Sequence, residues 1–97
     1  MNYPSTQKIV DYIVKSYRQA GKAMAKAASR NGALSSWMSQ DSFDETATNI
    51  QEAYNEGKFE DVDQSTLEKL FTKYGASDIY HLVASYFNST GKILRLA

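Results

Sequence analysis

The side chains that could catalyse a reaction are few in this sequence. His81 is its single histidine, and nucleophilic catalysis needs such a base beside a nucleophile and oriented by a third group. In a helix that begins at Ser77, His81 falls on the side opposite Ile79, Leu82 and Val83, so we expect its imidazole in solvent. The sequence therefore offers no catalytic residue, and we expect a protein that is not an enzyme.

Carboxylates are numerous after residue 40, and a pair of them can carry out acid–base catalysis when burial raises the pKa of one. Four of them fall on the polar side of one expected helix: Asp44, Glu45, Glu52 and Glu56. That side faces solvent in the expected bundle. We therefore interpret these carboxylates as the solvated face of a helix.

Metal and phosphate sites are also poorly supported. Asp61, Asp63 and Ser65 have the spacing that begins a calcium-binding EF-hand loop, but the positions that require glycine and glutamate hold Thr66 and Thr72. The chain has no cysteine, and its five glycines are too widely spaced for a phosphate-binding loop. We expect neither a metal nor a cofactor.

The charges of the chain are strongly segregated although its net charge is zero. Residues 1–30 carry six lysines and arginines against one acid, Asp11, whereas residues 41–69 carry nine acids against two lysines. Poles of about +5 and −7 govern encounter and partner choice rather than fold.

The longest helical pattern runs from a candidate N-cap at Ser5 to about Arg30, before the stop signal Asn31-Gly32. Wound at 100° per residue, it separates an apolar side from a cationic side. The apolar side holds Ile9, Val10, Ile13, Tyr17, Ala20, Met24, Ala27 and Ala28. The cationic side, called the basic face below, holds Lys8, Lys15, Arg18, Lys22, Lys26 and Arg30, with Tyr12 and Gln19 within or beside it.

The basic face has three interpretations. It is the solvated side of an amphipathic helix, it pairs with the acidic pole of the same molecule or of a second copy, or it binds nucleic acid with Tyr12 stacked on a base or ribose. Asp11 lies on the same face, at the spacing that pairs it with Lys15. The first interpretation carries the most weight.

Three shorter helices are predicted after the first. Capping boxes at Ser42–Glu45 and Ser65–Glu68 begin two of them, and Ser77 caps the third, which fades at Asn88. No segment alternates as a strand would. The sequence predicts one all-α domain over residues 1–97, a compact bundle of four main helices with a short helical turn near Trp37.

Two apolar segments are ambiguous. Trp37 and Met38, in the connection after the first helix, are residue types that anchor interfaces, but we favour a place for them over the core. The tail of residues 92–97 contains three large apolar side chains that dock either on their own bundle or on another chain.

These observations favour a small non-catalytic protein that binds another protein as an adaptor, regulator or inhibitor, such as an accessory protein of a phage or plasmid. The alternative is a nucleic-acid-binding protein that uses the basic face. The candidate partner-binding residues are Lys8, Tyr12, Lys15, Arg18, Lys22, Lys26, Arg30, Trp37 and Met38. The first residues lack the apolar run of a signal peptide and no stretch reaches membrane-spanning length, so we expect a cytoplasmic protein without a membrane partner.

Overall fold

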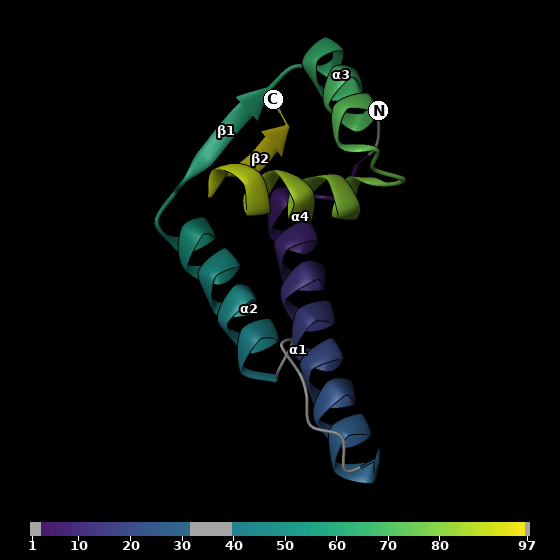
Figure 1. Cartoon of the computed structure of the whole chain (residues 1–97). Coiled ribbons are helices and arrows are strands. Elements are labelled where there is room, and N and C mark those ends of the chain that lie inside the picture. Colours follow the sequence, from purple (N-terminus) through teal and green to yellow (C-terminus); the bar gives the residue numbers. More distant parts are fainter. Residues whose placement is uncertain (1–2, 32–39, 97) are drawn as a thin grey trace.

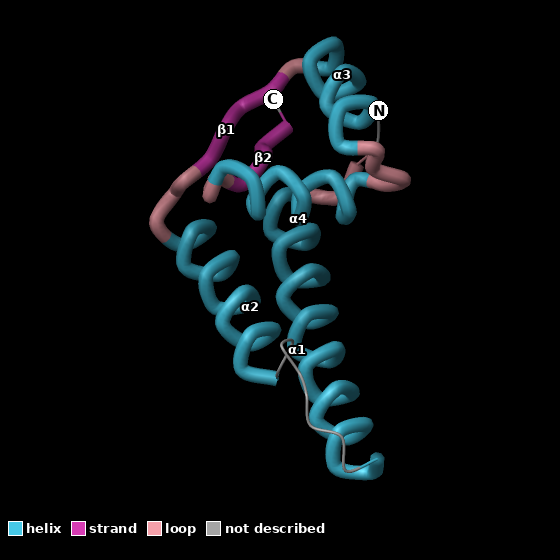
Figure 2. The backbone as a smooth tube through the Cα atoms, viewed as in Figure 1, coloured by secondary structure: helices cyan, strands magenta, loops and turns pink. Residues whose placement is uncertain are grey.

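In the computed structural model the chain is mostly helical and carries one small parallel sheet (Figure 1). The structure describes the backbone of residues 3–31 and 40–96, and the side chains of residues 3–26 and 41–96. The elements follow in the order α1 Thr6–Asn31, α2 Gln40–Asn55, β1 Phe59–Val62, α3 Gln64–Tyr74, α4 Ile79–Thr90 and β2 Ile93–Leu96. Figure 2 shows α1 and α2 running alongside each other, with α4 lying across α1 near its beginning.

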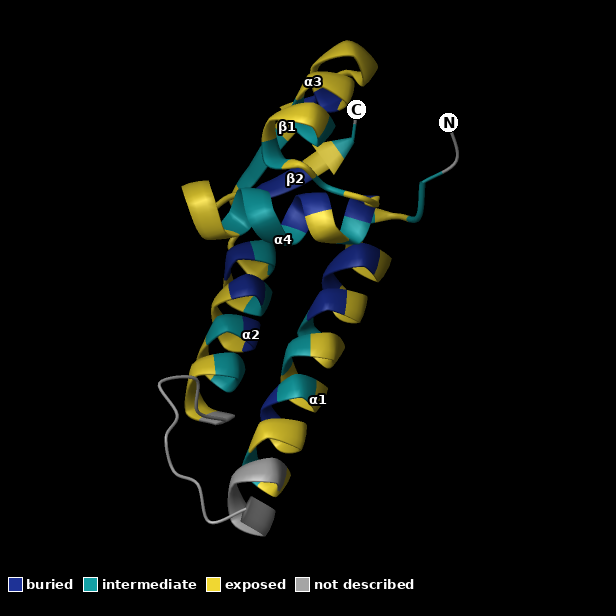
Figure 3. Ribbon diagram, turned by 45° about the vertical axis from the view of Figure 1, so that its right-hand side comes forward, coloured by how far each residue is buried: buried dark blue, intermediate teal, exposed yellow. Residues whose placement is uncertain are grey.

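The long first helix forms as the sequence predicts. Ser5 caps it, because the backbone N–H of Lys8 donates a hydrogen bond to the Ser5 hydroxyl at 3.3 Å. Its apolar side is buried at Ile9, Val10 and Ile13. In Figure 3 the buried turns of α1 lie near its beginning, where α4 crosses it, and α1 packs against both α2 and α4. The core of the protein is therefore built where the helices meet near the beginning of α1.

The far end of α1 extends beyond the start of α2 (Figure 1). The chain measures 48 × 27 × 22 Å, and its radius of gyration of 14.9 Å exceeds the roughly 13 Å of a compact domain of this length. Met24, which the helical phase places on the apolar side, is 38% exposed because no other element covers it within the described part of the chain. Ala27 and Ala28 lie outside the residues with described side chains.

The prediction of a purely helical domain is wrong in one respect. β1 and β2 pair in parallel, with Phe59 opposite Ile93 and Val62 opposite Leu96, and α3 and α4 form the crossover between them. The ambiguous tail is thereby placed in the protein's own core, where Ile93 and Leu94 are 0% and 1% exposed. A strand of four residues is too short to show an alternating pattern, and its partner is distant in the sequence.

In the three helices after α1, the predicted serines are not the N-caps. The N-cap of α3 is Asp63, whose carboxylate accepts from the N–H of Thr66 at 2.8 Å, and the N-cap of α4 is Asp78. Ser42 lies inside α2, which begins at Gln40. Aspartate caps as well as serine does, and its charge also suits the positive end of the helix dipole.

α3 and α4 each end at a glycine. Gly75 after α3 and Gly91 after α4 have φ values of +59° and +73°, the left-handed conformation that closes a helix. α4 therefore continues to Thr90, two residues past the predicted end at Asn88.

Candidate interaction surface

The basic face is exposed along the described part of α1. Lys8, Lys15, Lys22 and Lys26 are all exposed, and none of them forms an ion pair within the described residues. The spacing places Asp11 within reach of Lys15, but the structure does not pair these two side chains. The four lysines thus present unneutralised charge to a partner.

Other candidate residues lie apart from these lysines. Arg18 reaches toward α2, where its Nη2 lies 3.5 Å from the hydroxyl of Thr48. Arg30 belongs to α1, but its side chain is not described. Trp37 and Met38 lie outside the described residues. The basic face that the structure can support is therefore the row of four lysines with Arg18 at its α2 side.

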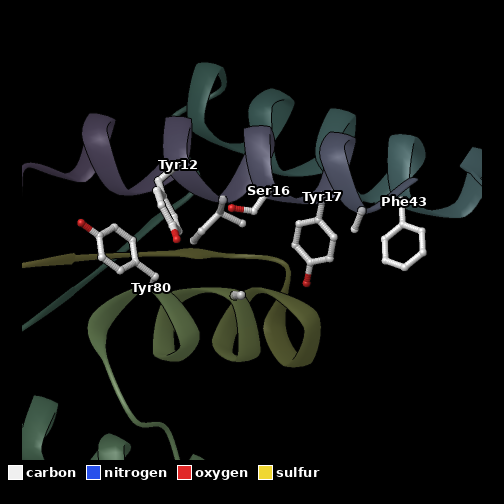
Figure 4. A pocket seen from close by; sticks show the side chains of 8 residues that line it. Tyr12, Ser16, Tyr17, Phe43 and Tyr80 are labelled. Atoms are coloured by element: carbon white, nitrogen blue, oxygen red, sulfur yellow. The ribbon is translucent and has the colours of Figure 1, made fainter. Parts of the chain in front are cut away.

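Tyr12 contacts a second aromatic residue. Its ring packs against Tyr80 of α4, with ring centroids 4.5 Å apart and planes inclined by 41°, yet the residue remains 55% exposed. The nucleic-acid interpretation of the basic face needs a ring that can stack on a base, whereas the structure packs this ring against a second tyrosine. This pair marks one end of a groove between α1 and α4 (Figure 4).

The groove is apolar and open, with a volume of about 300 Å³. Aromatic rings wall it while small side chains leave its centre empty. Its lining residues are Tyr12, Ile13, Ser16, Tyr17, Ala20, Phe43, Tyr80 and Ala84. Tyr17 and Phe43 form a second ring pair with centroids 6.2 Å apart. Figure 4 shows Tyr17 farther along α1 than Tyr12, with Phe43 of α2 beside it. The arrangement can receive a large apolar side chain.

A second hollow of about 300 Å³ continues the groove. It shares Tyr17 and Phe43 with the first, and its other lining residues are Ser42, Thr46 and Asn88. The groove therefore passes from an apolar end to an end lined by hydroxyl and amide groups. Among the residues that the structure describes, no charged side chain lines either hollow.

A third hollow, of about 310 Å³, lies between α2 and the end of α4 and has a more polar lining that includes Glu52, Glu56 and Lys58. Two of these charges are joined, because the ammonium of Lys58 lies 3.0 Å from the Glu56 carboxylate. Within the described residues no three histidine, cysteine or acidic side chains are grouped to hold a metal ion. The charged lining of the third hollow is thus partly neutralised by its own ion pair.

The resolved pKa shifts lie outside the groove. The guanidinium of Arg95 hydrogen-bonds the carboxylate of Asp61 and lowers the pKa of Asp61. The N–H of Thr66 lowers the pKa of Asp63 in the same way. Asp61 thus joins β1 to β2, and Asp63 caps α3. His81 is exposed, as predicted.

Sequence reasoning named Tyr12 but missed the groove's other walls. Tyr80, Ala84 and Phe43 come from elements distant in the chain, and their helical periodicity predicts only that they flank buried residues such as Ile79 and Ala47. The signal that was present is the i, i+4 spacing of Tyr80 and Ala84, which places both on one side of α4. That spacing alone does not identify which helix they face.

Comparison with known proteins gives no relative: no family model, curated protein or solved structure matches the chain significantly. None of the helices in the described residues has both the length and the apolar composition needed to cross a membrane.

Proposed function

We propose that this chain is a non-catalytic binding protein that acts by contact with another protein, as an adaptor, regulator or inhibitor. One observation carries the proposal: an apolar groove walled by the rings of Tyr12, Tyr80, Tyr17 and Phe43 opens at the surface beside exposed lysines. Aromatic side chains around a small apolar hollow are typical of protein-binding hot spots. Each of the two adjoining hollows, at about 300 Å³, also suits one anchoring side chain better than a large cofactor.

Nucleic-acid binding through the basic face is the second candidate. Lys8 to Lys26 extend over about 27 Å of α1, with 1.5 Å per residue, and the lysines are unpaired within the described residues. Phosphates, however, would contact the lysines alone and leave the apolar groove empty. The acidic helix α2, packed beside α1, also opposes the approach of a polyanion.

Photocrosslinking tests the proposal. A photoreactive amino acid placed at Ser16, an exposed position that lines the groove, should form adducts in extract of the source cell that protease removes and nuclease does not. The same probe at Ser65, exposed on α3, is the matched control and should give far fewer adducts. Nuclease-sensitive adducts at Ser16, or equal yields at the two positions, would contradict the proposal.

A further inference from the structure

The two long walls of the groove are helices, so the backbone groups along their middle are already hydrogen-bonded. Its two long sides are α1 and α4, whose backbone amides and carbonyls are hydrogen-bonded within each helix. An extended peptide would bring its own backbone groups into an apolar space where they find no partner, which costs free energy. A helical occupant satisfies its backbone internally and inserts only side chains. The groove therefore favours a helix.

The length of the groove fits two helical turns. From Tyr12 to Ala20 the lining covers nine residues of α1, which are about 12 Å apart at a rise of 1.5 Å for each of the eight steps. On α4, Tyr80, Ala84 and Asn88 follow one another at i, i+4 spacing along the two hollows. Two adjoining hollows over this distance match two anchor side chains one turn apart on the occupant.

Charge specifies one flank of that occupant. Lys8 and Lys15 lie at i−4 and i+3 from Tyr12, so they border the groove on the α1 side, and both are exposed without an ion-pair partner among the described residues. The border on α2 is acidic, because the exposed Asp41 and Glu45 adjoin Ser42 and Thr46, whereas the lining residue on α4 is the uncharged Asn88. Acidic side chains are therefore favoured on the flank of the occupant that faces Lys8 and Lys15, and disfavoured at the end that faces Asp41 and Glu45.

A second copy of this chain supplies no such helix from its described residues. Its own acidic helix, α2, has its apolar stripe buried, with Ala47 and Ile50 at 0% and 1% exposed. The apolar residues of α4, Leu82 and Val83, are equally buried. Charge attraction between the poles of two copies would thus leave the groove empty.

We infer that the groove between α1 and α4 binds an acidic amphipathic helix of a partner protein, which places two apolar anchors one turn apart in the groove and carboxylates against Lys8 and Lys15. The inference rests on the proposed function, because it names the chemistry of the protein that this surface contacts. Both the apolar and the electrostatic contributions are required, and they are separable by substitution.

The probe is a synthetic helical peptide with leucines four residues apart and glutamates along one flank. Two control peptides replace the glutamates by lysines or scramble the leucines. Fluorescence anisotropy should give an affinity for the acidic probe at least about tenfold above either control, and the affinity should fall as salt rises. Equal affinity for the lysine peptide would overturn the acidic assignment.

Two variants locate the probe. Ser16→Trp fills the groove from an exposed position and should weaken binding of the acidic probe about tenfold or more, whereas Ser65→Trp on α3 should not. Lys8→Glu with Lys15→Glu should weaken it comparably, whereas Lys69→Glu with Lys73→Glu on α3 should not. Circular dichroism and thermal midpoints verify that each variant is folded. An unchanged affinity in either groove-side variant would overturn the inference.

The outcomes separate this inference from the proposed function. If crosslinking at Ser16 captures protein but the acidic probe fails, only the acidic helix is excluded. If crosslinking captures no protein, both fall. Concentration-dependent dimerisation in sedimentation experiments that Ser16→Trp abolishes would assign the groove to a second copy and overturn the inference.

Discussion

Arg95 and Asp61 lie directly opposite each other in the parallel strands and are joined by two hydrogen bonds. The Nε of Arg95 donates to Oδ1 of Asp61 at 2.6 Å, and its Nη2 donates to Oδ2 at 3.0 Å. The same guanidinium lies 4.7 Å from the centre of the Phe59 ring. One arginine thus contacts two residues of the facing strand. This fixes the register of a sheet whose strands are only four residues long.

A double-mutant cycle should show that the two residues are coupled. We expect Asp61→Asn and Arg95→Gln each to lower the thermal midpoint by a small amount, and the double variant to lose less than the sum of the two. Arg95→Lys should not restore the midpoint, because an ammonium lacks the planar fork that makes both hydrogen bonds. The loss should be small because both side chains are about half exposed. Strictly additive losses would mean that the pair does not act as a unit.

Stability should decrease in acid partly through Asp61 and Asp63. Hydrogen bonds from Arg95 and from the N–H of Thr66 hold the pKa values of these carboxyls below the ordinary 3.8. A native pKa below the unfolded one gives stability that is complete above pH 3.8 and is lost as the pH falls through the lower native pKa. Urea midpoints measured from pH 2 to 7 should therefore depend less on pH in the acid range in Asp61→Asn and Asp63→Asn than in the native chain. An unchanged acid limb would contradict this assignment.

The first helix could be predicted from the sequence because its information is local. Ile9, Val10 and Ile13 recur with the helical period, so their burial can be predicted without knowing which element packs against them. The strands could not be predicted, because Glu60 and Asp61 make β1 resemble a polar loop. Their charges are matched by Lys92, 3.3 Å from Glu60, and by Arg95, both of which come from the end of the chain.

The candidate site was predicted in the same uneven way. The exposure of the lysines follows from the helical phase of α1 and is confirmed for Lys8, Lys15, Lys22 and Lys26. The groove depends on the crossing of α1 and α4, which brings Tyr80 to within 4.5 Å of Tyr12, measured between ring centroids. Such a crossing is set by the packing of the whole core, so no short stretch of the sequence predicts it.

The phase of α1 is testable by two substitutions two residues apart. Ile13 is 4% exposed, so Ile13→Asp buries an unpaired charge and should lower the free energy of unfolding by more than about 3 kcal/mol. Lys15→Asp is on the exposed side and should change it by less than about 0.5 kcal/mol. Urea unfolding followed by circular dichroism measures both. Equal damage from the two variants would mean that the helical phase is wrong.

The place of the tail in the core is testable at Leu94. This residue is 1% exposed, so Leu94→Ala leaves a cavity and should cost about 2–5 kcal/mol in the free energy of unfolding. Lys92→Ala, at an exposed neighbouring position, is the control and should cost much less. A near-native unfolding midpoint for Leu94→Ala would show that the tail does not contribute to the core.

Generic nucleic acid should bind weakly, with a dissociation constant above about 10⁻⁴ M at physiological salt. Packed helices lie about 8–10 Å apart, and the Debye length at that salt is about 8 Å, so the acidic pole on α2 reduces the attraction of the lysines on α1. Anisotropy titrations with labelled duplex and single-stranded DNA measure the affinity. Tight binding would contradict this prediction.

If such binding also showed a log–log salt slope that Lys15→Gln, Lys22→Gln and Lys26→Gln together reduced by about two to three units, the basic face would be a phosphate-binding surface. Ser16→Trp separates the two candidate functions, because it fills the groove without altering a charge and so should impair protein binding while leaving any phosphate contacts intact.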